Sequence, residues 1–106
     1  MTSETNQPTP APSLPVVHPL VDILESESEF LLVADLPGAA KEDLQLTVDE
    51  GKLNLAARGS GIEYRRSFAL GDEVEVEAIE AQLEHGELKI RLPKRAARVR
   101  KITVTG

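Results

Sequence analysis

The stretch Ala81-Gln82-Leu83-Glu84-His85-Gly86-Glu87-Leu88 predicts a β-hairpin. On both sides of His85-Gly86, which suits a tight turn, apolar side chains alternate with polar ones. The alternating apolar positions are Ile79, Ala81, Leu83, Leu88, Ile90 and Leu92. Successive side chains of a strand point to opposite faces, so these residues would share one face of a two-stranded unit. The pattern therefore indicates a sheet with one buried face.

The same period of two recurs along the chain from Leu20 onward. Short apolar alternations near residues 21–23, 30–36, 44–48, 53–55 and 64–70 are separated by turn-forming pairs such as Pro37-Gly38. Residues 39–43, which follow this pair, are expected to form one helical turn at most. Several short strands between turns predict an all-β fold, an immunoglobulin-like antiparallel β-sandwich with a mainly aliphatic core.

A chain of 106 residues is expected to hold one domain between two flexible ends. Residues 1–18 are rich in polar residues and Pro, so we expect a disordered N-terminal arm. The sandwich is assigned to residues 19–94, and residues 95–106 form a basic C-terminal extension. The chain shows neither the regions of a signal peptide nor an apolar run near the roughly 18 residues of a membrane span. The expectation is a soluble, cytoplasmic protein.

Charge is divided unevenly along the chain. Residues 1–87 hold all 18 acids and 5 bases (−13), whereas residues 88–106 hold 7 bases and no acid (+7), for a net charge of −6. The basic tail is expected to be attracted to the acidic body of a neighbouring copy, with a strength that salt reduces. Nucleic acid is not expected as a partner, because no aromatic residue lies among the cations of the tail and the body would repel phosphate.

Residues that would support catalysis or cofactor binding are few. No glycine-rich phosphate loop occurs, and Gly59-Ser60-Gly61 lacks the spacing of a nucleophile elbow. The two histidines, His18 and His85, lie far apart, and neither has a second metal ligand at close spacing. The absence of cysteine excludes thiolate chemistry and permits a reducing compartment. We therefore expect no cofactor, no metal site and no enzymatic activity.

An isolated apolar pair, Ile102 and Val104, lies beyond the basic residues of the tail. Being two residues apart, they would point to the same side of an extended segment and fill two adjacent pockets at a sheet edge. The alternative is a last strand folded back on its own sheet. The first interpretation predicts binding to copies of the chain or to exposed hydrophobic segments of other proteins.

Six short motifs occur in order along the chain. They are Val21-Asp22-Ile23-Leu24-Glu25, Ala34-Asp35-Leu36-Pro37-Gly38 with Lys41-Glu42-Asp43-Leu44, Gly51-Lys52-Leu53-Asn54-Leu55, Tyr64-Arg65-Arg66-Ser67-Phe68-Ala69-Leu70, the A-x-x-x-x-G-x-L signature from Ala81 to Leu88, and Leu92-Pro93-Lys94. With these motifs the chain resembles the small heat-shock proteins, the alpha-crystallin-domain family, from about Pro19 to Val104. Its terminal Ile102-Thr103-Val104 is similar to the family's I-x-I/V tail motif.

The resemblance implies an ATP-independent holdase, a chaperone that binds partly unfolded client proteins and prevents their aggregation. It also implies that the tail docks in a groove between two edge strands of a neighbouring domain. The groove residues would be Leu44, Leu46, Val48, Ile79, Ala81 and Leu83, for which plain core is the alternative role. The dimer interface would hold Tyr64, Arg66 and Phe68, with Arg66 in ion pairs; the alternative for Arg66 is a surface cation.

One departure from the family concerns the loop after Arg58. Similar bacterial and plant members carry a long loop there and exchange a strand in it to dimerise, whereas only Gly59-Ser60-Gly61-Ile62-Glu63 remains here. Residues 62–70 could instead pair with their own two-fold copy. The expected partners are client proteins and the chain itself, in a dimer, a larger homo-oligomer or a hetero-oligomer with a longer relative. The rival function is a CS-domain-like adaptor that is monomeric and binds one folded partner.

Overall fold

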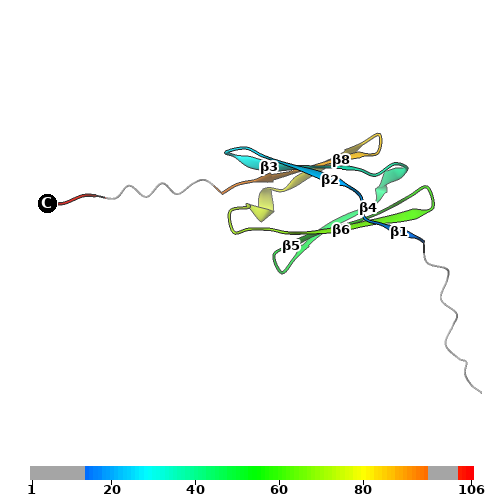
Figure 1. The fold of residues 1–106 in the computed structure, drawn as a ribbon, viewed down its shortest axis with the longest axis horizontal. Coiled ribbons are helices and arrows are strands. Elements are labelled where there is room, and N and C mark those ends of the chain that lie inside the picture. Colours follow the sequence, from blue (N-terminus) through cyan, green and yellow to red (C-terminus); the bar gives the residue numbers. More distant parts are fainter. Residues whose placement is uncertain (1–13, 96–102) are drawn as a thin grey trace, which may run out of the picture.

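The protein folds as two four-stranded sheets packed face to face, in a computed structural model that describes residues 14–95 and 103–106 (Figure 1). In order across the first sheet lie β1 (Val16–Val17), β6 (Ile62–Ala69), β5 (Lys52–Gly59) and β4 (Ala39–Asp49). The second sheet has the order β2 (Val21–Glu25), β3 (Glu29–Asp35), β8 (Glu87–Pro93) and β7 (Glu80–Glu84). A short 3-10 helix, η2 (Val76–Ala78), precedes β7. The predicted all-β sandwich is confirmed.

The hairpin predicted from the opening stretch of sequence is β7 joined to β8. Leu83 lies opposite Leu88, and Ala81 lies opposite Ile90. The turn residues His85 and Gly86 have φ angles of 51° and 78°. Two successive positive φ angles are typical of the two-residue turn whose twist matches that of the strands it joins. The turn and the register of this hairpin therefore follow directly from local sequence.

An apolar core fills the space between the two sheets. The side chains of Leu36, Leu53, Leu88, Ile90 and Leu92 are at most 1% exposed. Along β8 the buried residues alternate with exposed ones, as the period of two requires. Among the described residues no polar or charged residue is buried. The sheets are therefore held together by aliphatic burial, at roughly 1.5–3 kcal/mol for each fully buried side chain.

Residues 39–43 belong to β4, so the predicted helical turn is wrong. Ala39 pairs with Gly59, and the register then shifts before Leu44 pairs with Ala57. The two backbones approach so closely here that a Cβ on Gly59 would lie 2.3 Å from the carbonyl carbon of Gly38. A single helical turn orders several residues for one hydrogen bond, whereas pairing with β5 on both sides of the shift, at Ala39 and from Leu44 onward, holds the segment extended. Pairing with β5 therefore overrides the local sequence signal.

Residues 16–18 lie along β6, although the sequence analysis places them in the disordered arm. Val16 and Val17 pair in parallel with Glu63 and Tyr64. Their β-branched side chains, and the prolines that bracket the segment, favour an extended backbone. The edge of β6 supplies partner groups that the sequence alone does not reveal. Residues 1–13 of the predicted arm lie outside the described part of the chain.

Leu88→Ala is expected to lower the free energy of unfolding by about 2–5 kcal/mol, because it opens a cavity in the core. Leu88 is 0% exposed, and its neighbour Lys89 lies on the opposite, solvent-facing side of β8. Lys89→Ala is therefore the matched control, with an expected change below about 0.5 kcal/mol. Urea unfolding followed by far-ultraviolet circular dichroism measures both variants, and equal losses would contradict the observed alternation.

Candidate functional site

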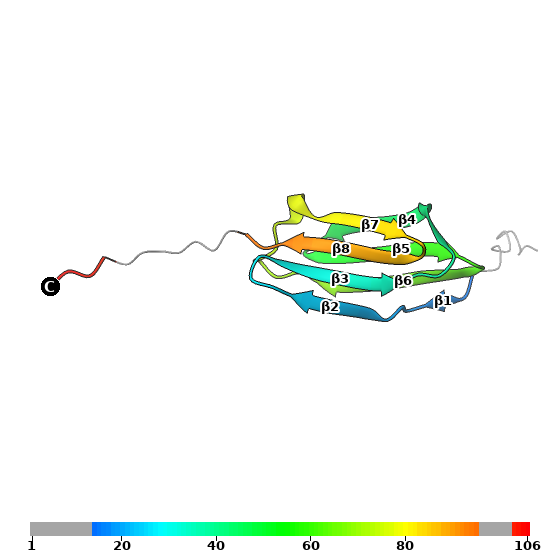
Figure 2. The same ribbon diagram turned by 90° about the horizontal axis from the view of Figure 1, so that it is seen from above.

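The strands β4 and β7 form the edges of the two sheets on the same side of the sandwich (Figure 2). β4 pairs with β5 alone, and β7 pairs with β8 alone. Within the described residues, the outer edge of each strand therefore has no neighbouring strand. Such an edge presents N–H and C=O groups to which a further extended segment can bind.

A groove about 410 Å³ in volume lies between these two edges. Its lining residues are Lys41, Leu44, Leu46, Ala81, Gln82 and Leu83; we call it the β4/β7 groove. Leu44, Leu46 and Leu83 are half-buried and pack against the core, while Ala81 is exposed. The two interpretations of these residues, groove and core, are thus compatible, because one side of each leucine faces the core and the other lines the groove.

The structure brings four of the six predicted groove residues together and leaves two apart. Val48 lies near the far end of β4, opposite Leu53, and is 38% exposed. Ile79 precedes β7 and packs against the core as a half-buried side chain. Neither residue lines the β4/β7 groove. Strand alternation predicts which side chains share a face of β4 or β7. Which of them line the groove depends on where the two strands lie beside each other.

Exposed carboxylates are close in sequence to the groove residues on both strands. Glu42 and Asp43 belong to β4, and Glu80 and Glu84 belong to β7. Lys41 is a cationic residue in the lining. An apolar floor between acidic borders favours an extended segment that carries apolar residues and positive charge.

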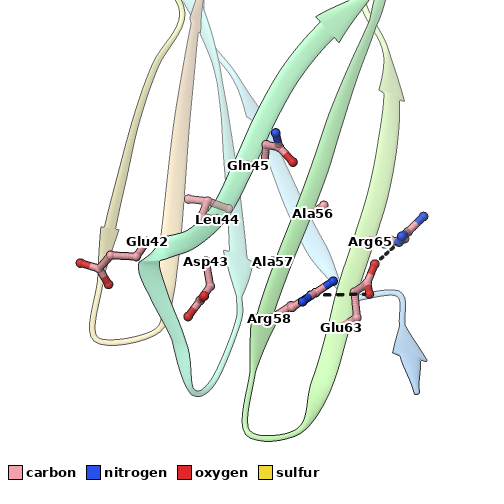
Figure 3. A pocket seen from close by; sticks show the side chains of 9 residues that line it. All are labelled: Glu42, Asp43, Leu44, Gln45, Ala56, Ala57, Arg58, Glu63 and Arg65. Carbon is pink, nitrogen blue, oxygen red and sulfur yellow. Dashed lines mark hydrogen bonds and ion pairs between the residues drawn. The ribbon is translucent and has the colours of Figure 1, made fainter. Parts of the chain in front are cut away.

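A second hollow, about 470 Å³ in volume, lies on the outer face of β4, β5 and β6 (Figure 3). Glu63 lies between two arginines in it, 4.0 Å from Arg58 Nε and in direct contact with Arg65. Both arginine side chains are more than 60% exposed. The Glu63 side chain is 13% exposed, but its charge is already paired with the two arginines. The β4/β7 groove is therefore the stronger candidate for binding.

The predicted tail motif falls mostly outside the described residues. Ile102 is not described, and Val104 is 89% exposed. The docking of Ile102 and Val104 in a neighbouring groove therefore stays a prediction.

The residues predicted for a dimer interface lie on the inner face of β6. Tyr64 is only 4% exposed, and its hydroxyl donates a hydrogen bond to the carbonyl of Pro37 at 2.7 Å. Tyr64 is thus a core residue of the single chain, and the assignment of Tyr64, Arg66 and Phe68 to a dimer interface stays a prediction. The alternation of β6 contained this signal, because Tyr64 shares a face with Ile62 and Phe68, which pack against the core.

Arg66 acts within the chain in this structure. Its Nη1 donates a hydrogen bond to the carbonyl of Pro19 at 2.9 Å, and its guanidinium lies 4.9 Å from the centre of the Phe68 ring. Among the described residues, the ion pairs do not include Arg66. Phe68 is half-buried and lines an apolar hollow with Ile23 and Phe30.

Comparison with known proteins shows which family the chain belongs to. Residues 22–105 match the Hsp20/alpha crystallin family. The chain belongs to this family. A probable 15 kDa heat shock protein of Leptospira interrogans is 31% identical, over 96% of this chain and 89% of that protein. A probable Hsp20 family chaperone of Onion yellows phytoplasma is 33% identical, over 70% of this chain and 66% of that protein.

Solved structures of small heat-shock proteins have the same fold. A small heat-shock protein from Xylella fastidiosa superposes with a TM-score of 0.70 at 33% identity, covering 83% of this chain and 96% of that one. The hspA of Xanthomonas axonopodis gives a TM-score of 0.63 at 34% identity, covering 76% and 94%. The resemblance inferred from six sequence motifs is confirmed. In the part of this small heat-shock protein that the structure describes, no helix has the length and apolar character to cross a membrane.

Tyr64→Phe is expected to lower the free energy of unfolding by about 1–3 kcal/mol, because the Pro37 carbonyl loses its partner. Ser67→Ala, on the exposed face of the same strand, removes a hydroxyl bonded only to Asn54 Oδ1 and is the control, at about 0.5 kcal/mol or less. Thermal unfolding measured by circular dichroism compares them. If the tyrosine variant proved as mild as the serine variant, the hydroxyl of Tyr64 would not stabilise the core.

Proposed function

We propose that this small heat-shock protein is an ATP-independent holdase of the cytoplasm, which binds partly unfolded proteins and prevents their aggregation without refolding them. The observation that carries the proposal is the β4/β7 groove, an apolar depression between two sheet edges that lack strand partners within the described residues. Membership of the Hsp20/alpha crystallin family and similarity to a probable Hsp20 family chaperone support it.

The groove binds an extended segment by two kinds of contact. Peptide groups at the edges of β4 or β7 hydrogen-bond to the backbone of the segment, whatever its sequence. Alternate apolar side chains of the segment pack on Leu44, Leu46 and Leu83. Partly unfolded proteins expose such segments, whereas folded proteins bury them. Recognition by backbone and by apolar pattern therefore selects for the unfolded state and not for one particular client.

The tail of a neighbouring copy is the second occupant of the β4/β7 groove. Burying Ile102 and Val104 yields about 3–6 kcal/mol before the ordering of the linker is subtracted, and ordering costs about 1–2 kcal/mol per residue. A single docked tail is then held only weakly, with a dissociation constant of about 1 mM or higher. Assemblies joined by several tails persist through effective concentration, and each tail releases readily to expose a groove to clients.

Aggregation of a heat-labile client enzyme, followed by light scattering without ATP, tests the holdase function. Suppression near stoichiometric ratios is expected. Ala81→Gln adds a polar side chain to the groove and is expected to raise the required ratio by about tenfold, the factor that about 1.4 kcal/mol of lost binding produces. Thr47→Gln adds the same side chain to an exposed position of β4 that does not line the groove, and it is the matched control.

If neither the parent nor the control suppresses aggregation, the chain is not a holdase on its own. A monomer that binds one dominant folded partner in place of many clients would then indicate the CS-domain-like adaptor. Equal suppression by both glutamine variants would show that clients bind elsewhere than in the β4/β7 groove.

Replacing both Ile102 and Val104 with Ala is expected to reduce the assembly to a dimer or monomer, because the paired side chains no longer fill adjacent pockets. Thr103→Ala changes the residue between them, whose side chain would point the opposite way, and is the control. Light scattering coupled to size-exclusion chromatography measures the mass. An unchanged mass in the double variant would exclude the tail as the contact that builds the assembly.

A further inference from the structure

The end of β8, where the C-terminal extension begins, lies beside the start of β3 (Figure 2). Residues 93–95 hydrogen-bond there to the turn between β2 and β3 on one side and to residues 73–75 on the other. The three backbone bonds run from Lys94 N to the carbonyl of Ser28 at 2.8 Å, from Glu75 N to the carbonyl of Pro93 at 2.7 Å, and from Arg95 N to the carbonyl of Glu73 at 2.6 Å. Residues 93–95 are therefore bonded on both sides, as a central strand is.

The side chain of Lys94 lies on the inward face of this segment. The buried residues of β8 alternate and end with Leu92, and Lys94 follows Leu92 by two positions. The Lys94 side chain is only 18% exposed. Its Nζ lies 2.6 Å from Oε2 of Glu25 and 4.7 Å from the centre of the Phe30 ring. The cation at the last inward position is thus held by a carboxylate and an aromatic ring.

Both segments that hold residues 93–95 are attached to the core. Val74, in the middle of residues 73–75, is 3% exposed. Phe30, at the start of β3, is half-buried and packs against the core residues. The start of the C-terminal extension is therefore fixed to the body of the domain at two places.

We propose that Lys94 is a positioning residue, which fixes where the C-terminal extension starts and in which direction it leaves the body. The inference rests on the proposed docking of Ile102 and Val104 in a neighbouring β4/β7 groove. Lys94 does not line that groove. It acts through the backbone of residues 93–95, which its side chain keeps between the two holding segments. Lys94 thereby limits which neighbouring grooves the tail can reach.

The length of the chain sets the size of this limit. Ile102 is seven residues after Arg95, and an extended chain spans at most about 25 Å over that number. If residues 93–95 were released, the last fixed residue would be Leu92, ten residues before Ile102, and the span would rise to at most about 36 Å. A released extension reaches grooves at more distances and from more directions. The held start is therefore expected to permit fewer kinds of assembly.

The test compares three substitutions in the full chain. Lys94→Gln removes the charge that pairs with Glu25 and Phe30, whereas Lys94→Arg keeps a cation at the same position. Lys89→Gln is the matched control, because Lys89 also belongs to β8 and also pairs with a carboxylate, that of Glu87 at 3.8 Å. The Lys89 side chain is 54% exposed and lies away from residues 93–95.

Amide hydrogen exchange of Glu75 and Arg95 measures the local effect, because their N–H groups make two of the three backbone bonds. Exchange at both amides is expected to be about tenfold faster in Lys94→Gln, unchanged in Lys89→Gln and restored in Lys94→Arg. Equal exchange in the parent and in Lys94→Gln would overturn the proposal. Where circular dichroism shows Lys94→Gln to be unfolded, Glu25→Gln replaces it and is expected to act in the same direction.

Sedimentation velocity measures the effect on assembly. Lys94→Gln is expected to widen the range of sedimentation coefficients about twofold or more, whereas Lys94→Arg and Lys89→Gln keep the range of the parent. A residue that only stabilised the fold would lower the midpoint of urea unfolding and leave this range unchanged. That result would overturn the positioning role of Lys94.

The double variant Ile102→Ala with Val104→Ala separates this inference from the proposed docking. Its Glu75 and Arg95 amides are expected to exchange as in the parent, because residues 93–95 are held locally. An unchanged mass in the double variant would overturn the docking, and the positioning role with it. A reduced mass in the double variant, together with an unchanged range in Lys94→Gln, would overturn the positioning role alone.

Discussion

The face-to-face packing of two open sheets over an apolar core is the constraint on which the rest of the structure depends. Leu88 and Ile90 of β8, with Leu53 and Leu55 of β5, are almost completely buried in this core. Open sheets, unlike closed barrels, end in strands whose peptide groups lack partners on one side. The strand orders place β4 and β7 at one side and β1 and β2 at the other. The sandwich therefore has two sides formed by edge strands. Within the described residues, these sides differ in whether another segment of the chain lies along them.

Within the described residues, the side formed by β4 and β7 has no further strand, and carboxylates lie along it. Carboxylates along both strands oppose edge-to-edge pairing between identical copies, which is how many β proteins avoid aggregation. In our proposal the same carboxylates favour the basic tail of a neighbouring copy as an occupant of the groove. Acidic residues beside an apolar groove thus oppose edge-to-edge pairing of identical copies and favour a segment that is basic and apolar. In our proposal this combination lets the protein expose a surface for unfolded clients.

The other side is partly covered by the chain itself. Residues 15–19 run along β6 in the first sheet and lead directly into β2 of the second. Arg66 connects the two parts of this path, because it extends from β6 to the carbonyl of Pro19. A residue expected in contacts between subunits is thus engaged within one subunit.

Local sequence by itself determined most of the strands, the β7–β8 hairpin and the family. The alternation around His85-Gly86 specified the register of β7 and β8, because a two-residue turn allows little choice. It also specified the inward faces of Leu44, Leu46 and Leu83, since side chains alternate on a strand whatever lies beside it. The motifs from Val21 to Lys94 were sufficient to assign the family.

Only the tertiary structure decided which edges meet and which are covered. Residues 39–43 became strand because β5 lay beside them, and Val16 and Val17 became strand because β6 had an unpaired edge. Tyr64 became a core residue because the carbonyl of Pro37, 27 positions away in sequence, lies within reach of its hydroxyl. These outcomes depend on partners distant along the chain. Alternation with a period of two indicates the face of the strand on which a side chain lies. It does not indicate which distant residue packs against that side chain.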